Sequence, residues 1–216
     1  MSGEYFGRSR NEVLPHIPQG AKRVLELGCG TGATLRAVKQ QLGGGGSLWF
    51  GGIELVEAAA AEARGVCDQV WVGDVESLTF DGDIEKGSLD VILCLDVLEH
   101  LVDPWSMVAR LTPLLKPGGR LIASIPNVRN WKFIWGLLFR GDFHYKDAGL
   151  LDRTHLRFFV KETAAELVTC GGLTLVEAVS TRPFKPWETR WILIKLSFGG
   201  LEELLIKQYL YVAEAR

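Results

Sequence analysis

The chain has 216 residues, of which 47% are hydrophobic, and its formal net charge is −2 at pH 7. This length and apolar content suit one packed α/β domain, which we expect to span residues 1–216, and the charge argues against a general nucleic-acid-binding surface. The four cysteines lack C-x-x-C spacing, which argues against a zinc site or a disulfide framework, and no apolar run suits a signal region or a membrane span, so we expect a cytoplasmic protein.

Strand and helix patterns alternate as far as Ile125, which predicts a parallel sheet with helices on both faces. In chain order, the expected elements are a strand at Arg23–Leu27, a helix from Thr31 to just before Gly43, a strand at Leu48–Leu55, a helix at Val56–Arg64, strands at Gln69–Val72 and Leu89–Leu95, a helix from Pro104 to about Leu115, and a strand at Arg120–Ile125. Residues 127–161 show neither a helical nor a strand period. They are followed by an expected helix at Lys161–Cys170, a strand at Leu173–Val179, a mostly buried helix at Trp187–Phe198 and a strand at Ile206–Ala213.

A glycine-rich turn follows the first expected strand. Gly28, Gly30 and Gly32 would let the backbone approach a ligand closely, and a turn between strand and helix is the place of a nucleotide-type cofactor site. Glu26 precedes this turn, and its carboxylate would repel the diphosphate of a dinucleotide. S-adenosylmethionine has no phosphate and carries a cationic amino group, so it suits this turn better.

A dinucleotide site is the rival interpretation of the same turn. Gly28, Gly30 and Ala33 also satisfy the looser G-x-G-x-x-G/A fingerprint. Glu54 stands where the ribose-binding acid of such a fold is expected. A nicotinamide-dependent dehydrogenase therefore stays an alternative on this segment alone.

The run Glu26-Leu27-Gly28-Cys29-Gly30-Thr31-Gly32 closely resembles the first motif of the class I S-adenosylmethionine-dependent methyltransferases. The later pieces Asp96–Leu101 and Leu115–Leu121 match the same family in type and order, and the resemblance runs from about residue 5 to the C-terminus. It implies an α/β fold with a seven-stranded, doubly wound sheet of strand order 3-2-1-4-5-7-6, in which strand seven is antiparallel. It also implies S-adenosylmethionine as the cofactor.

Open α/β sheets bind ligands beyond the carboxyl ends of their strands, and the candidate cofactor residues are taken from there. Glu54 can accept hydrogen bonds from ribose hydroxyls. The resemblance implies that Asp74 takes the adenine amino group, while Arg10 could pair with the methionine carboxylate. The alternatives without a role in cofactor binding are a solvated loop acid for Glu54, a simple Gly-Asp turn for Asp74 and a frayed surface arm for Arg10. The expected cofactor-binding residues are Arg10, Glu26, Gly28, Cys29, Gly30, Thr31, Gly32, Glu54, Leu55, Asp74, Val75, Leu95 and Asp96.

Asp96, Glu99 and His100 would share one face if a helical turn starts after the fourth strand. Asp96 as N-cap with Glu99 three residues later forms a capping box, which favours a structural role with His100 orienting the loop. Ubiquinone-type O-methyltransferases carry a similar run, and some use it to hold a divalent metal. We expect no metal site here; substrate contact, a general base and a metal site remain the alternatives.

Segment 127–161 is expected to form a lid insertion over the catalytic mouth, where binding residues concentrate. It holds eight aromatic residues and seven Lys or Arg against three Asp, which suits a sugar ring or aglycone carrying phosphate or carboxylate. The candidate substrate-binding residues are Asn127, Arg129, Tyr145 and Arg153. A hydrophobic lid with a solvated basic face is the alternative. A membrane-surface role for Trp131–Phe139 is less favoured, because the stretch is short and not clearly amphipathic.

The run Leu151–Phe159 resembles one found in methyltransferases of bacterial surface-polysaccharide and secondary-metabolite pathways. His155 is the first candidate for a general base, with Asp152 orienting it, because methyl transfer to a hydroxyl needs the proton removed. His144 and His100 are the further candidates. Alternatively, His155 only locks the lid onto the following helix.

These features together predict an enzyme that moves a methyl group from S-adenosylmethionine to an oxygen or nitrogen of a small molecule, such as a saccharide or a secondary metabolite. A cofactor-binding partner or regulatory subunit without its own turnover is the alternative. We expect no nucleic-acid partner and no membrane span, and a homodimer is compatible with the sequence. Glu26 and the later matching pieces disfavour the dehydrogenase.

Overall fold

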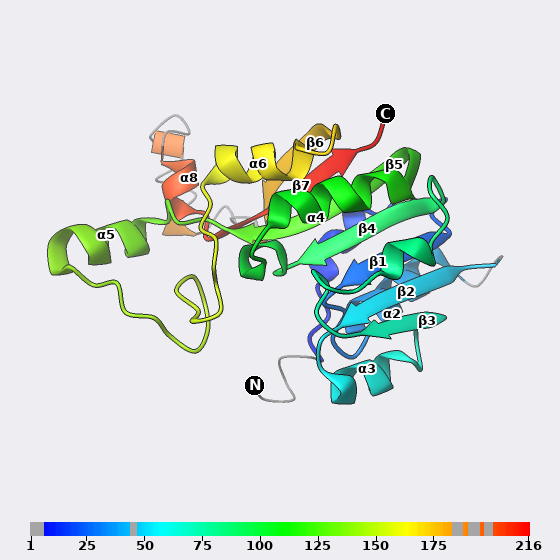
Figure 1. Ribbon diagram of the computed structural model, residues 1–216. Helices are drawn as coiled ribbons and strands as arrows, with labels where there is room; N and C mark the ends of the chain where they lie inside the picture. The colour runs from blue at the N-terminus through cyan, green and yellow to red at the C-terminus, as the bar shows by residue number, and fades with distance from the viewer. Residues whose placement is uncertain (1–6, 44–46, 183–187, 190–194, 197–200) are drawn as a thin grey trace.

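The computed structural model describes residues 7–43, 47–182, 188–189, 195–196 and 201–216 (Figure 1). Its strands form one seven-stranded sheet of order β3-β2-β1-β4-β5-β7-β6. The strands are β1 (Arg23–Leu27), β2 (Trp49–Glu54), β3 (Gln69–Val72), β4 (Leu89–Leu95), β5 (Leu115–Pro126), β6 (Thr174–Ser180) and β7 (Gln208–Glu214). Strand β7 runs antiparallel to β5 and β6, and the pairs among the first five strands are parallel. The predicted strand order is confirmed.

The described helices cover both faces of this sheet (Figure 1). They are η1 (Asn11–His16), α2 (Ala33–Leu42), α3 (Glu57–Ala63), η2 (Phe80–Gly82), η3 (Leu98–His100), α4 (Pro104–Leu111), η4 (Thr112–Leu114), α5 (Trp131–Arg140), α6 (Lys161–Thr169) and α8 (Glu202–Leu205), where η marks short 3₁₀ turns. Helix α4 illustrates the local causes. Asp103 caps its first turn by accepting from the Ser106 N–H, and Pro104 suits the first helical position.

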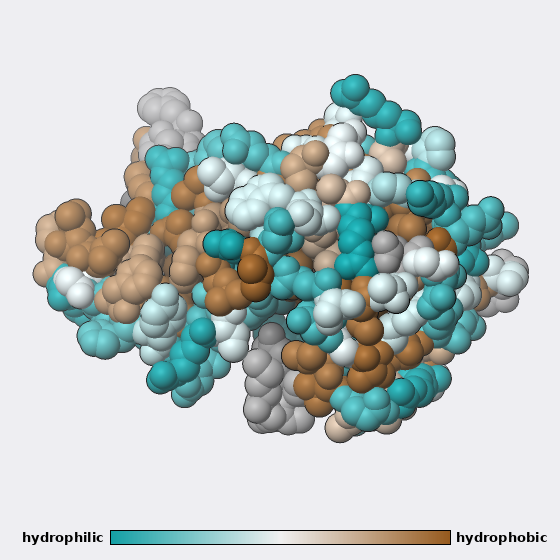
Figure 2. Space-filling model, in the orientation of Figure 1, coloured by the Kyte–Doolittle hydropathy of each residue, from teal (hydrophilic) through white to brown (hydrophobic). Residues whose placement is uncertain are grey.

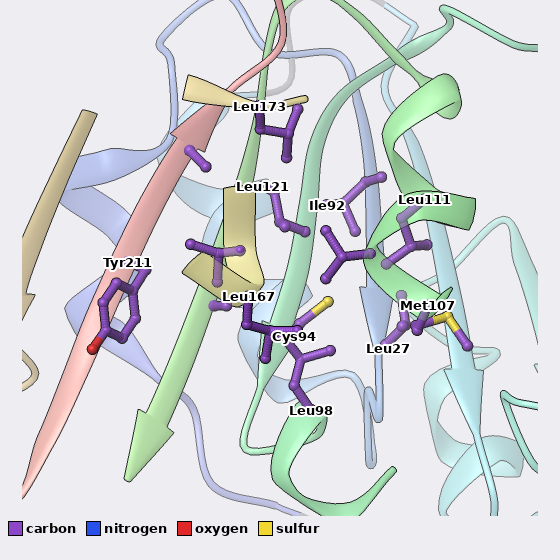
Figure 3. Close-up of a cluster of buried hydrophobic side chains, with 14 of the residues drawn as sticks. Leu27, Ile92, Cys94, Leu98, Met107, Leu111, Leu121, Leu167, Leu173 and Tyr211 are labelled. Atoms are coloured by element: carbon purple, nitrogen blue, oxygen red, sulfur yellow. The ribbon is translucent and has the colours of Figure 1, made fainter. Parts of the chain in front are cut away.

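All seven residues of β4 are buried, and alternate side chains enter two different cores. Ile92 and Cys94 pack with α4 and α6 on one face, a cluster that Figure 3 shows in close-up. Val91 and Leu93 pack on the other face with residues of η1 and α2. A strand covered on both sides reads as a continuous apolar run, which is why its bounds were predictable.

Segment 127–161 contains a helix that the sequence analysis did not expect. The Asn130 side chain caps α5 by accepting from the Lys132 N–H, and Gly141 ends the helix with φ +60°. No residue of α5 is buried, so its apolar residues do not face the core. The expected helix at Trp187–Phe198 lies largely outside the described residues.

Within the described residues, no helix is long and apolar enough to cross a membrane. The described cysteines, Cys29, Cys67, Cys94 and Cys170, are all free thiols. The sheet brings the carboxyl ends of β1, β2, β4 and β5 to one edge. The amino end of β7 reaches the same edge, because Gln208 pairs with Pro126 at the end of β5. This edge carries the candidate site.

Candidate functional site

The glycine turn after β1 has the backbone that the sequence predicted. Gly28, Gly30 and Gly32 have φ of +66°, +54° and +75°, the left-handed region that glycine adopts without strain. The Glu54 carboxylate accepts the Gly30 N–H at 2.8 Å and the Val56 N–H at 2.9 Å. Glu54 therefore ties the glycine turn to the end of β2, and its remaining lone pairs can still accept a ligand hydroxyl.

Glu26 lies beneath this turn with only 3% of its surface exposed. Within the described residues, its Oε2 atom has no hydrogen-bond partner. Burial, followed by the nearby Cys67, raises the pKa of the Glu26 carboxyl well above its usual range. The Thr34 side chain hydrogen-bonds this carboxyl, but a buried oxygen without a partner is costly, and a cationic group brought beside it would relieve that cost.

Asp96 follows β4 and has φ +58°, a conformation uncommon for a residue other than glycine. Its carboxylate binds the Arg10 guanidinium and the Gln208 amide, and the Ser124 hydroxyl donates to it at 3.0 Å. The expected capping box is wrong, because the residue before η3 is Val97 and makes no side-chain cap. Arg10 is held by Asp96 and Glu12 rather than standing free for a ligand.

The other expected cofactor residues surround the same edge. Leu55 is 67% exposed at the end of β2, whereas Val75 and Leu95 are mostly buried. Asp74 is exposed, and its Oδ1 accepts the Glu76 N–H, which is the geometry of the simple Gly-Asp turn. Cys29 is buried and Thr31 is half-buried within the turn. These residues lie at or just beyond the carboxyl ends of β1, β2, β3 and β4, the edge that also carries Glu26 and Glu54.

A cavity of about 540 Å³ opens beside Asp96, and two of the three predicted histidines, His100 and His155, line it. His100 comes from η3 and His155 from the loop before α6, and their ring centroids are 4.6 Å apart. The Nδ1 atom of His155 lies 3.0 Å from the Leu150 carbonyl oxygen, and that of His100 lies 3.1 Å from the Thr154 carbonyl oxygen.

A carbonyl oxygen can only accept, so each Nδ1 carries the hydrogen and each Nε2 keeps a lone pair. Burial, followed by the charge of His155, lowers the pKa of His100, which keeps this imidazole neutral near pH 7. The prediction that Asp152 orients His155 is wrong, because the Asp152 carboxylate accepts from Thr154 instead. The backbone carbonyl of Leu150 does the orienting.

Glu99 lies against the same pair of imidazoles. It is 1% exposed, and neither carboxyl oxygen has a hydrogen-bond partner among the described residues. Burial, followed by the charge of Asp96, raises the pKa of Glu99 well above its usual range, so a cation brought beside this carboxyl would favour its charged form. The Glu99 carbonyl oxygen also accepts the N–H groups of Leu156 and Arg157, which fastens the loop to η3.

The donor atoms of Glu99, His100 and His155 lie within 4.8 Å of one another. Sequence spacing grouped Glu99 and His100 with Asp96 and not with His155. Two imidazoles and one carboxylate suit a divalent cation, and the lack of hydrogen bonds on Glu99 fits such a ligand. Asp96, which the sequence grouped with them, is instead engaged with Arg10. A cation held by the three would polarise an acceptor hydroxyl.

The remaining site residues predicted in segment 127–161 mostly contact other parts of the protein. His144 is 87% exposed and pairs with Asp142, outside the cavity lining. Asn127 is buried and donates to the Glu203 and Ile206 carbonyls, while Arg129 pairs with the Glu203 carboxylate. Arg153 pairs with Asp147, and Tyr145 is 47% exposed. None of these five predicted residues lines the cavity.

Sequence reasoning missed the residues that do line it beside the histidines. They include Asn130, Lys132, Phe133, Lys146, Lys207 and Gln208. Lys207 precedes β7 and Gln208 begins it, and an antiparallel strand brings its amino end to the edge where parallel strands end. The expected antiparallel direction of strand seven already implied that its amino end would reach this edge.

Comparison with known proteins identifies the family of this fold. A family model described as "Methyltransferase domain" matches residues 25–121. "Ubiquinone biosynthesis O-methyltransferase" of Xanthomonas axonopodis pv. citri (strain 306) is 34% identical over 186 residues, which cover 80% of this chain and 70% of the relative. The protein of the same name from Xanthomonas euvesicatoria pv. vesicatoria (strain 85-10) is 33% identical over 191 residues, covering 82% and 73%.

Solved structures show the same fold. A SAM dependent methyltransferase from Archaeoglobus fulgidus matches with a TM-score of 0.64 at 18% identity, covering 99% of this chain and 94% of that one. One from Mesorhizobium loti matches with a TM-score of 0.63 at 15% identity, covering 97% and 99%. Sheet order, glycine turn and relatives agree, and the chain belongs to the class I S-adenosylmethionine-dependent methyltransferases, with S-adenosylmethionine as its cofactor.

Proposed function

We propose that this methyltransferase acts on a hydroxyl oxygen of a small molecule that binds in the 540 Å³ cavity. The carrying observation is the pair of imidazoles, His100 and His155, whose Nδ1 atoms are occupied and whose Nε2 lone pairs are available. The 34% identical relative is named an O-methyltransferase, which supports oxygen as the accepting atom. A saccharide or a secondary metabolite is the acceptor class that we propose, as the run Leu151–Phe159 indicates.

In this mechanism, the Nε2 atom of His155 takes the proton from the acceptor hydroxyl as its oxygen attacks the methyl carbon. The C–S bond of the sulfonium breaks in line with the new C–O bond, and its electron pair stays on sulfur as S-adenosylhomocysteine leaves. His100 beside it is neutral at the start of the step, and its Nε2 lone pair can in turn accept the proton from His155. These reaction steps require no bound cation, because the Nε2 atom of His155 already takes the hydroxyl proton.

The test is a transfer assay with methyl-labelled S-adenosylmethionine and a panel of saccharides and phenols, each offered with and without a carboxylate or phosphate. Label on a hydroxyl oxygen of a panel member supports the proposal. Label on nitrogen alone contradicts it. A protein that binds S-adenosylhomocysteine yet labels no panel member also contradicts it, and favours a cofactor-binding partner subunit.

We propose that Glu54 and Asp74 recognise the ribose and the adenine of the cofactor. Losing a charged hydrogen-bond partner costs about 1.5–3 kcal/mol, so Glu54→Ala and Asp74→Ala should each weaken S-adenosylhomocysteine binding roughly ten- to a hundredfold by calorimetry. Glu57→Ala is the matched control, because this acid lies three residues beyond Glu54 and pairs with Arg64 at the surface. Either variant binding as tightly as wild type would remove that residue from the site.

We further propose that Glu26 receives the ammonium group of the cofactor. Its pKa is raised by burial in the free protein, and a cation beside it favours the charged form, so binding should release a proton from Glu26. Cofactor affinity should therefore fall as pH drops. Calorimetry in buffers of different ionisation enthalpy measures this proton, and Glu26→Gln should bind without releasing it. Equal proton release by both proteins would contradict the assignment.

A further inference from the structure

Helix α5 turns an apolar stripe toward solvent. Trp131, Trp135, Leu138 and Phe139 are spaced as i, i+4, i+7 and i+8, a spacing that puts them on one helix face. Their exposed fractions are 43%, 51%, 70% and 62%. In Figure 2 the end of the molecule that carries α5 is correspondingly brown. Proteins that stay monomeric rarely expose apolar patches of this kind without a partner.

Basic residues lie at both ends of this stripe, and the acids nearest to it in sequence, Asp142 and Asp147, follow the helix and pair with His144 and Arg153. Lys132 and Arg140 lie at the two ends of α5, and the helix contains no acid. Lys146 and Lys207 line the neighbouring cavity together with Lys132. Among the described residues, none of these four forms a salt bridge. Lys146 lies near the Asp142 carboxylate, so Lys132, Arg140 and Lys207 are the charges open to an anionic partner.

We propose that α5 is an interfacial helix that docks the protein onto an anionic lipid surface. Its tryptophans and aliphatic side chains would enter the boundary between headgroups and acyl chains, while the basic residues meet lipid phosphates. Ten residues are too few to span a bilayer, so the helix lies in the plane of the surface.

A second copy of the chain fits the stripe less well. Two-fold pairing along α5 would bring Lys132 and Arg140 of one copy near the same residues of the other, and like charges repel. An anionic lipid surface has the opposite sign and matches the apolar stripe as well. The inference rests on α5 and the basic residues beside it, and does not depend on which acceptor is methylated.

Vesicle sedimentation tests the inference with the full chain. We expect binding to phosphatidylcholine–phosphatidylglycerol vesicles, at least about tenfold tighter than to phosphatidylcholine alone and weaker in high salt. Trp135→Ser with Leu138→Ser should weaken it at least about tenfold, and Arg140→Glu should weaken binding to the mixed vesicles only. Val176→Ser is the matched control, since Val176 is 51% exposed on β6, away from α5, and should bind like wild type.

S-adenosylhomocysteine affinity, measured on every variant, shows that each one is folded and separates docking from methyl transfer. Vesicle binding by a protein without turnover would support docking and contradict the proposed function. Absence of binding to the mixed vesicles, or equal binding by the Trp135→Ser, Leu138→Ser variant, would overturn the inference. So would analytical ultracentrifugation showing a dimer that this variant dissociates, because the stripe would then be an interface between copies.

Discussion

Gly30→Val is expected to abolish measurable S-adenosylhomocysteine binding while the protein remains folded. Gly30 is buried in the turn at φ +54°, and its N–H is bound to Glu54, so a branched side chain there fills the space that the cofactor needs. A loss of at least about a hundredfold in affinity by calorimetry is the expected result. The variant's thermal melt should remain cooperative.

Gly118→Val separates the steric effect from backbone strain. Gly118 has φ +75°, and a Cβ atom there would meet nothing within 4 Å. Both variants carry the left-handed backbone cost of about 1–2 kcal/mol, but only the first lies at the cofactor edge. Gly118→Val should therefore lose stability and keep affinity. A folded Gly30→Val protein with wild-type affinity would show that the cofactor does not pass over this turn.

His155→Ala is expected to lower turnover by roughly a hundredfold or more while S-adenosylmethionine binding stays nearly intact. The His155 side chain lines the acceptor cavity, its Nδ1 is bound to the Leu150 carbonyl oxygen, and it is not part of the glycine turn. A general base must be unprotonated to take the hydroxyl proton, so the wild-type rate should fall as pH drops through the range in which an ordinary imidazole is protonated, about 6.5. Burial, followed by the charge of His155, lowers the pKa of the neighbouring His100, so that residue keeps its lone pair to lower pH.

His144→Ala is the matched control, because this histidine is 87% exposed and lies outside the cavity lining. It should keep wild-type turnover. Full activity in His155→Ala, with an unchanged pH profile, would move the proton to His100 or leave positioning alone. Loss of activity on dialysis against EDTA, restored by a divalent cation, would contradict the metal-free mechanism and assign Glu99, His100 and His155 to a cation.

The sheet could be predicted because its signals are local. β1, β3 and β4 are each mostly apolar runs bounded by turn residues, and their predicted bounds agree with the structure at both ends. Helix α5 escaped prediction although Asn130 and Gly141 mark its ends. Its apolar residues face solvent, and a period that nothing buries was not recognised as a helix.

The run Asp96–His100 shows where local reasoning failed. Spacing alone groups Asp96, Glu99 and His100 on one face, and a capping box is the ordinary interpretation of such spacing. In the fold, Asp96 takes a left-handed backbone and turns to Arg10, which is 86 residues away in sequence. A contact of that range has no counterpart in the spacing of neighbouring residues.

The sequence by itself determined the sheet, the glycine turn and the family, because strand periodicity and glycine placement are properties of short segments. Only the tertiary structure decided which side chains meet in the cavity. His155 joins His100 because backbone bonds from Leu156 and Arg157 fasten its loop to Glu99, and Gln208 arrives because β7 runs antiparallel. Such meetings depend on how distant segments close on one another, and that closure is set by packing and hydrogen bonding across the whole fold rather than by any local pattern.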